Sequence, residues 1–414
     1  MARREGSRVL TLMVTCRYCE GTRLVRILDL GEQPWGNDFI PIEEKRQPQK
    51  YPLELYFCRT CALVQIGYTI PKERMFSEHL YFSGTTRSLR AHFERVADEI
   101  LTRRNPAEGL VLDVGGNDGT FLQAFVRKGI RVLNVDSGRL QAERSRQNGV
   151  VCLQAFFNRD CARRILVEHG PARVIHGSGI FFHLEELKSA FEGVRELLEP
   201  GGLLVVEFIY LPEMIRKCAF DQIYHEHLVY YSLSTLGRIL ESHGLEIVDC
   251  GFPSIHGGSC IAYAGHAGGQ PRSPALLEAL RREKAGGMLE EAVYHDFALR
   301  VCRLRDTLTT LIRSLRREGK SIQTLGAPVK GSTIINFCGL TERDIDCATE
   351  INEAKCGTTI PGTRIPVLHQ DRTPPPDVYL LLAWNFKEEI LSRLGAYRAR
   401  GGKILVPIPE PELI

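Results

Sequence analysis

The sequence lacks a long hydrophobic run, a large net charge, and any repeated or low-complexity segment. No stretch approaches the roughly 20 apolar residues that a membrane-spanning helix needs, which argues against a membrane protein. The 53 Lys and Arg residues nearly balance the 50 Asp and Glu residues, so bulk binding of nucleic acid is not indicated. The charged segment from Met1 to Ser7, with no signal-peptide cleavage site after it, predicts a cytoplasmic protein.

The chain has the length and composition of a multidomain globular protein. At 414 residues it is too long for one ordinary core, which predicts two or three domains. Hydrophobic residues make up 43% and charged residues 25%, values typical of folded domains, which excludes wholesale disorder. We expect the boundaries near residues 75 and 270.

Apolar strands alternate with helices in two stretches of the chain. In the first, strands are expected at residues 109–114, 131–135, 173–176 and 203–207, with helices at 88–102, 120–128 and 184–198. In the second, strands are expected at 321–325, 377–382 and 402–407, the last of the chain, with helices at 334–338 and 388–395. Such alternation predicts two parallel sheets with crossover helices. A helical connector is expected between them, at 273–317.

Four of the 13 cysteines form two CxxC pairs, Cys16-Arg-Tyr-Cys19 and Cys58-Arg-Thr-Cys61. In a large chain without a secretion signal, paired cysteines are read as metal ligands and the others as small buried hydrophobes. Two pairs complete a tetrahedral four-thiolate zinc site, which has no open position and is therefore structural. A few strands are expected between the pairs.

Other interpretations of these cysteines are two unrelated buried pairs, a redox site, or a nucleic-acid-binding zinc finger. The redox interpretation is disfavoured because neither pair opens a helix after a strand. The zinc-finger interpretation is disfavoured because the segment between the pairs carries acidic residues such as Asp29 and Glu54, so its charge is mixed.

A glycine-rich turn follows the first expected strand of the central region, with Asp113 at the strand end. The turn reads Gly115-Gly116-Asn117-Asp118-Gly119, and its glycines allow a ligand to approach the backbone closely. A dinucleotide fingerprint would read GxGxxG and hold a diphosphate, whereas carboxylates suit the cationic amino-acid part of S-adenosylmethionine. This favours a methyltransferase, with dinucleotide binding and a degenerate fold as the alternatives.

Two further features support the same cofactor. Asp136 ends the second strand of this region, where the ribose hydroxyls of such cofactors are held. Phe156 and Phe157 follow a third short strand and are expected to flank the adenine.

Four more motifs complete a resemblance over the whole chain: Phe220-Asp-Gln-Ile-Tyr-His-Glu-His227, His256-Gly-Gly-Ser259, Asn336-Phe-Cys-Gly339 and Ala383-Trp-Asn385. The chain resembles the three-domain nucleotide-sugar C-methyltransferases, which methylate a ring carbon of a keto-deoxysugar in antibiotic sugar biosynthesis. The type reaction is at C-3 of a dTDP-4-keto-hexose. The resemblance implies an α/β protein with a zinc-binding module (1–75), a Rossmann-like class I methyltransferase domain (76–270) and a second Rossmann-like domain (271–414).

The resemblance also implies which residues do the chemistry. His227 is the candidate base that removes a C–H proton next to the keto group, since imidazole titrates near neutrality. Glu226 and Tyr224 are expected to orient this base or to polarise the keto group. His183 is expected to hold a sugar oxygen or to assist proton transfer, and His256 to lie in a turn near the substrate.

The turn from Gly326 to Thr333 precedes a helix and is a candidate diphosphate cradle. Its candidate contacts to the nucleotide sugar are Lys330, Ser332, Thr333, Asn336 and Lys355. A purely structural turn is the alternative.

The sequence departs from the family pattern at Gly179, Ile209 and Ala155, where Asn, Pro and an acidic residue are usual. These departures leave open a methyltransferase that acts on oxygen, nitrogen or a non-sugar carbon acid. A third hypothesis is a zinc-ribbon protein that binds a partner and carries an inactive Rossmann domain. The sequence does not indicate an oligomeric state.

Overall fold

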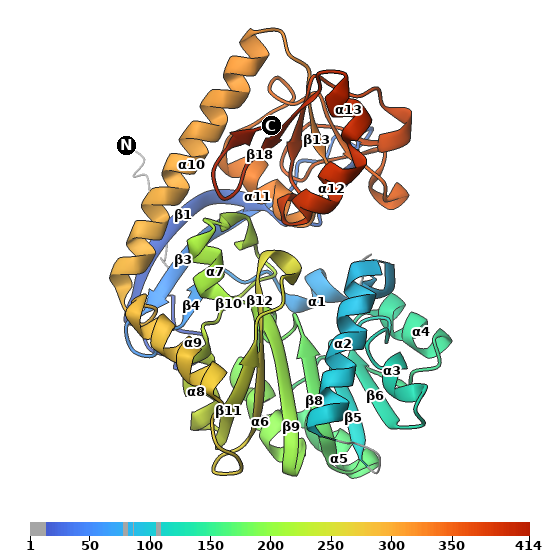
Figure 1. Ribbon diagram of the computed structural model, residues 1–414, viewed down its shortest axis with the longest axis vertical. Helices are drawn as coiled ribbons and strands as arrows, with labels where there is room; N and C mark the ends of the chain where they lie inside the picture. The colour runs from blue at the N-terminus through green and yellow to red at the C-terminus, as the bar shows by residue number, and fades with distance from the viewer. Residues whose placement is uncertain (1–13, 78–81, 86, 105–108) are drawn as a thin grey trace, which may run out of the picture.

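The computed structural model describes residues 14–77, 82–85, 87–104 and 109–414 (Figure 1). The expectation that rests on Met1 to Ser7 therefore lies outside the described residues. Three main sheets, of four, seven and six strands, are joined by a small two-stranded sheet. Across the described ranges, no helix combines the length and apolar character needed to cross a membrane.

The four-stranded sheet is built mainly from the N-terminal region. Its strands are β1 (Leu24–Pro34), β3 (Lys50–Cys58), β4 (Val64–Ile66) and β10 (Val229–Tyr230), all antiparallel. Along β3, every second residue is buried, so one face of the strand packs on the core. The expected strands between the two cysteine pairs are confirmed, with the short β2 (Ile40–Pro41) among them.

The seven-stranded sheet has the order β11-β12-β9-β8-β5-β6-β7. Its strands are β5 (Leu110–Val114), β6 (Arg131–Asp136), β7 (Cys152–Gln154), β8 (Ala172–Ser178), β9 (Leu198–Ile209), β11 (Leu245–Gly251) and β12 (Ser259–His266). The strands from β5 to β9 are parallel to one another. The strand order reverses at β5, and ligands of such sheets bind beyond the carboxyl ends of the strands at that point.

Helices cover both faces of this sheet because its strands are buried on both sides. On one face, Val111 and Val174 pack with α2 (Arg87–Arg103) and with the segment around α3 (Gln123–Val126). On the other face, Leu112 belongs to the main core. The helices of the central region that contribute to that core include α5 (Arg159–His169), α6 (Leu187–Leu197), α7 (Leu211–Arg216) and α8 (Leu233–Ser242). A further helix, α4 (Arg139–Gln147), packs near β6 and β7.

The six-stranded sheet has the order β16-β14-β13-β17-β18-β19 and is parallel except for β19. Its strands are β13 (Ile322–Leu325), β14 (Cys347–Glu350), β16 (Val367–His369), β17 (Val378–Leu381), β18 (Lys403–Val406) and β19 (Glu412–Leu413). Its helices are α11 (Val329–Phe337), α12 (Lys387–Arg393) and α13 (Gly395–Ala399). The helical connector consists of α9 (Pro274–Ala285) and α10 (Glu291–Arg317).

The predicted α/β fold class is confirmed, but some element boundaries were wrong. The helix expected at 334–338 begins at Val329, directly after Pro328, whose restricted φ suits a helix start. The strand expected to be the last is followed by β19, and the short strands β14 and β16 were not anticipated. The helix expected at 120–128 is the short α3.

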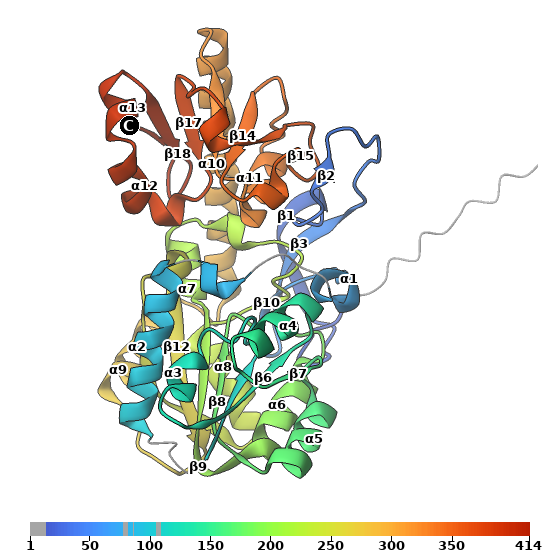
Figure 2. The ribbon, with the colours of Figure 1, turned by 90° about the vertical axis from the view of Figure 1, so that its right-hand side faces the viewer.

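The three regions interlock rather than follow one another. The central region supplies β10 to the N-terminal sheet, and β15 (Thr358–Thr359) of the C-terminal region pairs with β2. Figure 2 shows β1 and β2 extending beside α11 and β15. As a result, the end of β1 reaches the junction between the central and C-terminal regions.

Candidate active site and zinc site

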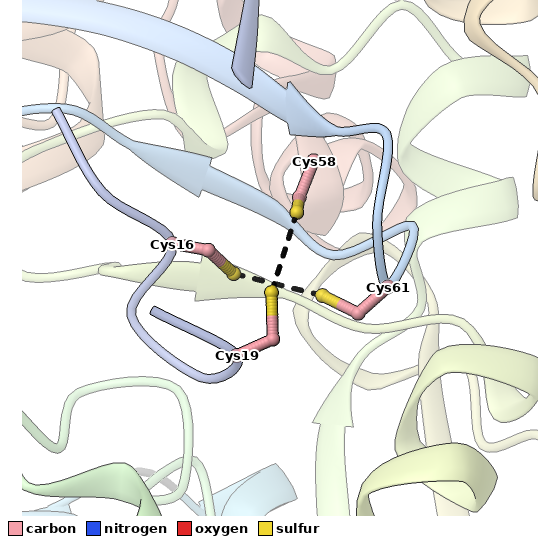
Figure 3. Close-up of side chains that lie close together, drawn as sticks. All are labelled: Cys16, Cys19, Cys58 and Cys61. Carbon is pink, nitrogen blue, oxygen red and sulfur yellow. Dashed lines mark hydrogen bonds between the residues drawn. The ribbon is translucent and has the colours of Figure 1, made fainter. Parts of the chain in front are cut away.

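The four sulfurs of Cys16, Cys19, Cys58 and Cys61 converge (Figure 3). They all lie within 4.8 Å of one another, and the Cys16–Cys61 and Cys19–Cys58 sulfurs are 3.6 Å apart. A tetrahedral zinc with Zn–S bonds of about 2.3 Å places its sulfurs about 3.8 Å apart. The geometry therefore fits zinc. The hydrogen bond from the Cys61 thiol lowers the pKa of Cys16 to about 5, which favours a thiolate there.

The glycine turn after β5 is shaped by backbone that side chains would obstruct. Gly115 and Gly119 have φ of +67° and +77°, and Asn117 has φ of +52°. A Cβ on Gly116 would collide with the carboxylate of Asp113 and the side chain of Asn134. Glycine is therefore required at these positions, and Asn tolerates the left-handed conformation better than most residues.

The carboxylate of Asp136 joins the turn to the second strand. Its Oδ2 accepts a hydrogen bond from Asn117 N at 2.9 Å, and its Oδ1 accepts one from Gly138 N at 2.8 Å. Burial raises the pKa of Asp136 to about 6, because the charged form is kept from water. The expected ribose contact is thus a carboxylate with an unusually high pKa.

A buried pair that sequence reasoning missed lies under the turn. His176 of β8 has its Nδ1 2.7 Å from Asp113 Oδ1, and its ring stacks on Phe121 at 3.7 Å between centroids. Burial raises the pKa of Asp113, although the histidine opposes this. The position of His176 in a strand that is buried on both faces could have marked it as buried, but nothing local indicated its partner.

The segment between the N-terminal sheet and α2 covers the turn from outside. In the short η1 (Ser83–Thr85), Ser83 N donates to Asn117 Oδ1 at 3.1 Å and Gly84 N donates to Asp118 Oδ2 at 2.9 Å. In α1 (Lys72–Phe76), the Lys72 amine lies 4.9 Å from the Phe156 ring centroid. These contacts bring a second wall to the cofactor side of the site.

The prediction for the aromatic pair needs a correction. Phe157 is 4% exposed and belongs to the main hydrophobic core, so its ring is taken up by packing. Phe156 is only partly buried. Of the two rings, Phe156 is therefore the one that remains a candidate for the adenine contact.

The predicted catalytic histidines meet at the carboxyl ends of the strands. The ring centroids of His183 and His227 are 5.1 Å apart, and the ring centroid of Tyr224 is 4.0 Å from that of His227. Leu228 N donates to Phe182 O at 2.8 Å, which holds the two segments together.

Backbone carbonyls set the tautomer of both histidines. His227 Nδ1 donates to Gln222 O at 2.8 Å, and His183 Nδ1 donates to Glu226 O at 2.5 Å. A neutral ring with its proton on Nδ1 carries the lone pair on Nε2. His227 is 4% exposed, so its orientation is fixed by packing as well.

The loop after β8 connects the histidines to the glycine turn. Ile180 lies so close to Gly115 that a Cβ on this glycine would be 2.7 Å from Ile180 Cγ1. His183 follows three residues later, and its amide donates to Ile180 O at 2.9 Å. The glycine turn and the candidate histidines therefore contact the same short segment.

The expectation that Glu226 orients His227 is not supported by its hydrogen bonds. Its Oε1 instead accepts from Trp35 Nε1 at 2.8 Å and from Asn37 Nδ2 at 2.6 Å. Burial raises the pKa of Glu226, and these donors and Lys355 oppose the rise. Trp35 and Asn37 were missed because they are about 190 residues away in sequence.

The expected diphosphate cradle is corrected as well, because its hydroxyls are engaged inside the fold. Thr333 is 1% exposed, and its Oγ1 donates to Ile223 O at 3.1 Å. Ser332 is also buried and donates to Val329 O at 2.7 Å. Both residues lie inside α11 rather than in a turn before it, so they serve packing and the domain junction.

The remaining candidate substrate residues also have protein partners. Lys330 Nζ donates to Asn385 Oδ1 at 2.6 Å and lies 3.6 Å from a carboxylate oxygen of Asp221. Lys355 Nζ donates to Ala327 O at 2.9 Å, and Asn336 Nδ2 donates to two backbone carbonyls. His256 lies in η3 (Ile255–Gly257), and its side chain is outside the described set.

Three family models match successive parts of the chain. A zinc binding domain matches residues 16–76, a methyltransferase domain 86–249 and a C-methyltransferase C-terminal domain 254–409. The C-methyltransferase NovU of Streptomyces niveus is 34% identical over 404 residues, which is 96% of each chain. The chain belongs to the C-methyltransferase family. As a member, this C-methyltransferase is an enzyme that uses S-adenosylmethionine and carries zinc at its four cysteines.

Solved structures of other methyltransferases are more distant from this C-methyltransferase. Magnesium protoporphyrin IX methyltransferase of Synechocystis PCC 6803 is 15% identical, with a TM-score of 0.36 over 43% of this chain and 83% of that one. The CcbJ methyltransferase of Streptomyces caelestis is 17% identical, with a TM-score of 0.34 over 42% of this chain and 90% of that one. At such low sequence identity and TM-score, these similarities say nothing about the substrate.

Proposed function

We propose that the protein transfers the methyl group of S-adenosylmethionine to a ring carbon of a nucleotide-linked keto-deoxysugar, at C-3 next to a 4-keto group. The observation that carries this proposal is the hydrogen bond from His227 Nδ1 to Gln222 O. It leaves the basic lone pair on Nε2, in a ring that is buried beside Tyr224 and His183. Methylation of carbon needs such a base, whereas an oxygen or nitrogen nucleophile carries its own lone pair.

In the proposed reaction, His227 Nε2 takes the proton from the carbon next to the ketone, and the electron pair of the C–H bond forms an enolate. The Tyr224 hydroxyl is the candidate donor that stabilises the enolate oxygen, and His183, whose Nε2 carries a lone pair, is the candidate to accept a hydrogen bond from a sugar hydroxyl. S-adenosylmethionine supplies an electrophilic methyl group bound to a sulfonium. The carbon–methyl bond forms as the methyl–sulfur bond breaks, and His227 then releases its proton to solvent.

We further propose that the regions divide the work as the sequence indicates: residues 1–75 hold the zinc, 76–270 the methyl donor and the reacting carbon, and 271–414 the nucleotide part of the sugar. Asp113, Gly115, Gly116, Asn117, Gly119 and Asp136 form the donor side. From the sequence analysis and the family resemblance, we place the enzyme in the cytoplasm and in the formation of an antibiotic sugar.

The proposal is tested with methyl-labelled S-adenosylmethionine and a dTDP-4-keto-deoxysugar, by locating the label in the product by NMR. Label on C-3 is the expected result. Label on an oxygen or nitrogen instead would show that the same scaffold serves another chemistry.

The base is tested by exchange of the sugar C–H proton with deuterium from solvent. We expect His227→Asn to slow this exchange by at least about 100-fold, the usual contribution of a general base. His295→Asn is the control, because His295 is exposed on α10 and bonds to Glu291. Exchange at the parental rate in the His227 variant would remove this residue as the base.

A further inference from the structure

The loop after β1 contributes to the catalytic region although it belongs to the N-terminal, zinc-binding region. β1 begins five residues after Cys19 and extends over 11 residues to Pro34, which at about 3.3 Å per residue is about 35 Å. Trp35 and Asn37 follow at its far end. This loop therefore lies at the opposite end of the strand from the cysteines.

The loop has a defined conformation and is packed from two sides. Asp38 N donates to Trp35 O at 3.0 Å, which closes a turn. Gly36 packs so closely on α11 that a Cβ there would be 2.6 Å from Val329 Cγ1. The Trp35 ring packs against the small core cluster that includes Met75. The indole and amide N–H groups are thus held in place before any ligand arrives.

Both N–H groups donate to the same oxygen of Glu226, Oε1. Among the described residues, none donates a hydrogen bond to its Oε2. Charge-assisted bonds of this kind favour the ionised carboxylate, which opposes the effect of burial. The other groups that face Glu226 are Lys355, whose charge also favours ionisation, and His183, which bonds to its backbone carbonyl. Tyr224 and His227 are its neighbours in the segment.

We propose that Trp35 and Asn37 are positioning residues that hold Glu226 as a carboxylate with Oε1 occupied, so that Oε2 accepts a hydrogen bond from a hydroxyl of the substrate. The zinc-binding region thereby takes part in substrate recognition through the end of β1. This inference rests on the proposed function, because it assumes that the substrate binds beside His227.

The test is the pH dependence of kcat/KM in Trp35→Phe and Asn37→Ser. Loss of one donor destabilises the carboxylate, so the pKa of Glu226 rises and the protonated form persists to higher pH. Protonation of His227, the proposed base, also lowers kcat/KM at low pH, so the limb of Glu226 is identified as the one that Glu226→Gln lacks. We expect this limb to move up by about one pH unit in each variant, since the lost bond is charge-assisted. Activity should fall about tenfold below that limb and recover above it.

Tyr56→Phe is the matched control. Its hydroxyl also donates to a carboxylate of the N-terminal sheet, Glu54, at 2.8 Å, but this pair is not among the residues at the catalytic site. We expect its acidic limb to be that of the parental protein. Thermal unfolding of all variants separates a loss of stability from a change in the profile.

A double-mutant cycle shows whether Trp35 acts through Glu226. In a Glu226→Gln background, we expect Trp35→Phe to change kcat/KM less than twofold. The inference would be overturned if the acidic limb of Glu226 stayed at the same pH in the single variants. It would also be overturned if Trp35→Phe changed kcat/KM as much in the Glu226→Gln background as in the parental protein. Failure of the proposed function is seen separately, because the parental protein itself would then place no methyl group on carbon.

Discussion

Asp221 and Trp384 meet across the junction between the central and C-terminal regions, with Trp384 Nε1 donating to Asp221 Oδ2 at 2.7 Å. Lys330 Nζ lies 3.6 Å from the same oxygen. Asp221 is 0% exposed, and burial raises its pKa while Lys330 opposes the rise. Asp221 directly precedes Gln222, whose carbonyl accepts a hydrogen bond from His227, so the junction adjoins the residue that we propose as the base.

Lys330→Met is expected to destabilise the protein rather than to weaken nucleotide binding. Removal of one partner of a buried ion pair leaves an uncompensated charge, at a cost of about 3–5 kcal/mol in the free energy of unfolding. Denaturant unfolding measures this loss. Lys387→Met is the control, because its pair with Glu412 is exposed and worth about 0–1 kcal/mol. A raised KM for the nucleotide sugar with unchanged stability would instead restore the diphosphate role.

Gly116→Ala is expected to weaken S-adenosylmethionine binding at least about tenfold, because its Cβ collides with Asp113 and Asn134 and must displace the turn. Isothermal calorimetry measures the dissociation constant. Gly237→Ala is the control, since a Cβ there meets only Ile247 Cδ1 at 3.9 Å. Equal affinity in both variants would show that the donor does not contact this turn.

The affinity for S-adenosylmethionine should fall as pH drops below about 6, the pKa to which burial raises Asp136. Only the ionised carboxylate keeps all its acceptor positions for ribose hydroxyls, and it takes up a proton below this pH. Calorimetry from pH 5 to 8 would show the change. In Asp136→Asn, we expect weaker binding at pH 8 and loss of this pH dependence. A parental affinity that is constant over the range would contradict the assignment.

Metal analysis should find about one zinc per chain, because four thiolates complete one tetrahedral site. Cys58→Ser should lose this ion and unfold at lower temperature, since β1 and β3 are tied together beside the site. Cys302→Ser is the control, because Cys302 is outside the four-cysteine cluster. Well under one ion in the parental protein would refute the four-thiolate site.

Local patterns were enough for much of the fold and part of the site. The glycine turn, Asp113 and Asp136 lie where the sequence predicted, because a strand, its turn and the next helix are adjacent in the chain. The sequence failed for Phe157, which packs in the core, and for Thr333, which bonds to Ile223. Burial depends on which surfaces meet, and the spacing of residues within one segment does not specify that.

The sequence by itself determined the four-cysteine cluster, the glycine turn after β5 and the place of the candidate segment from Tyr224 to His227, since these depend on residue types at short spacing. Only the tertiary structure decided the partners of Glu226 and Lys330. Trp35 is 191 residues from Glu226 in the chain, and loop closure over such a distance favours no particular partner. The packing of the N-terminal and C-terminal regions against residues 220–227 selects these contacts.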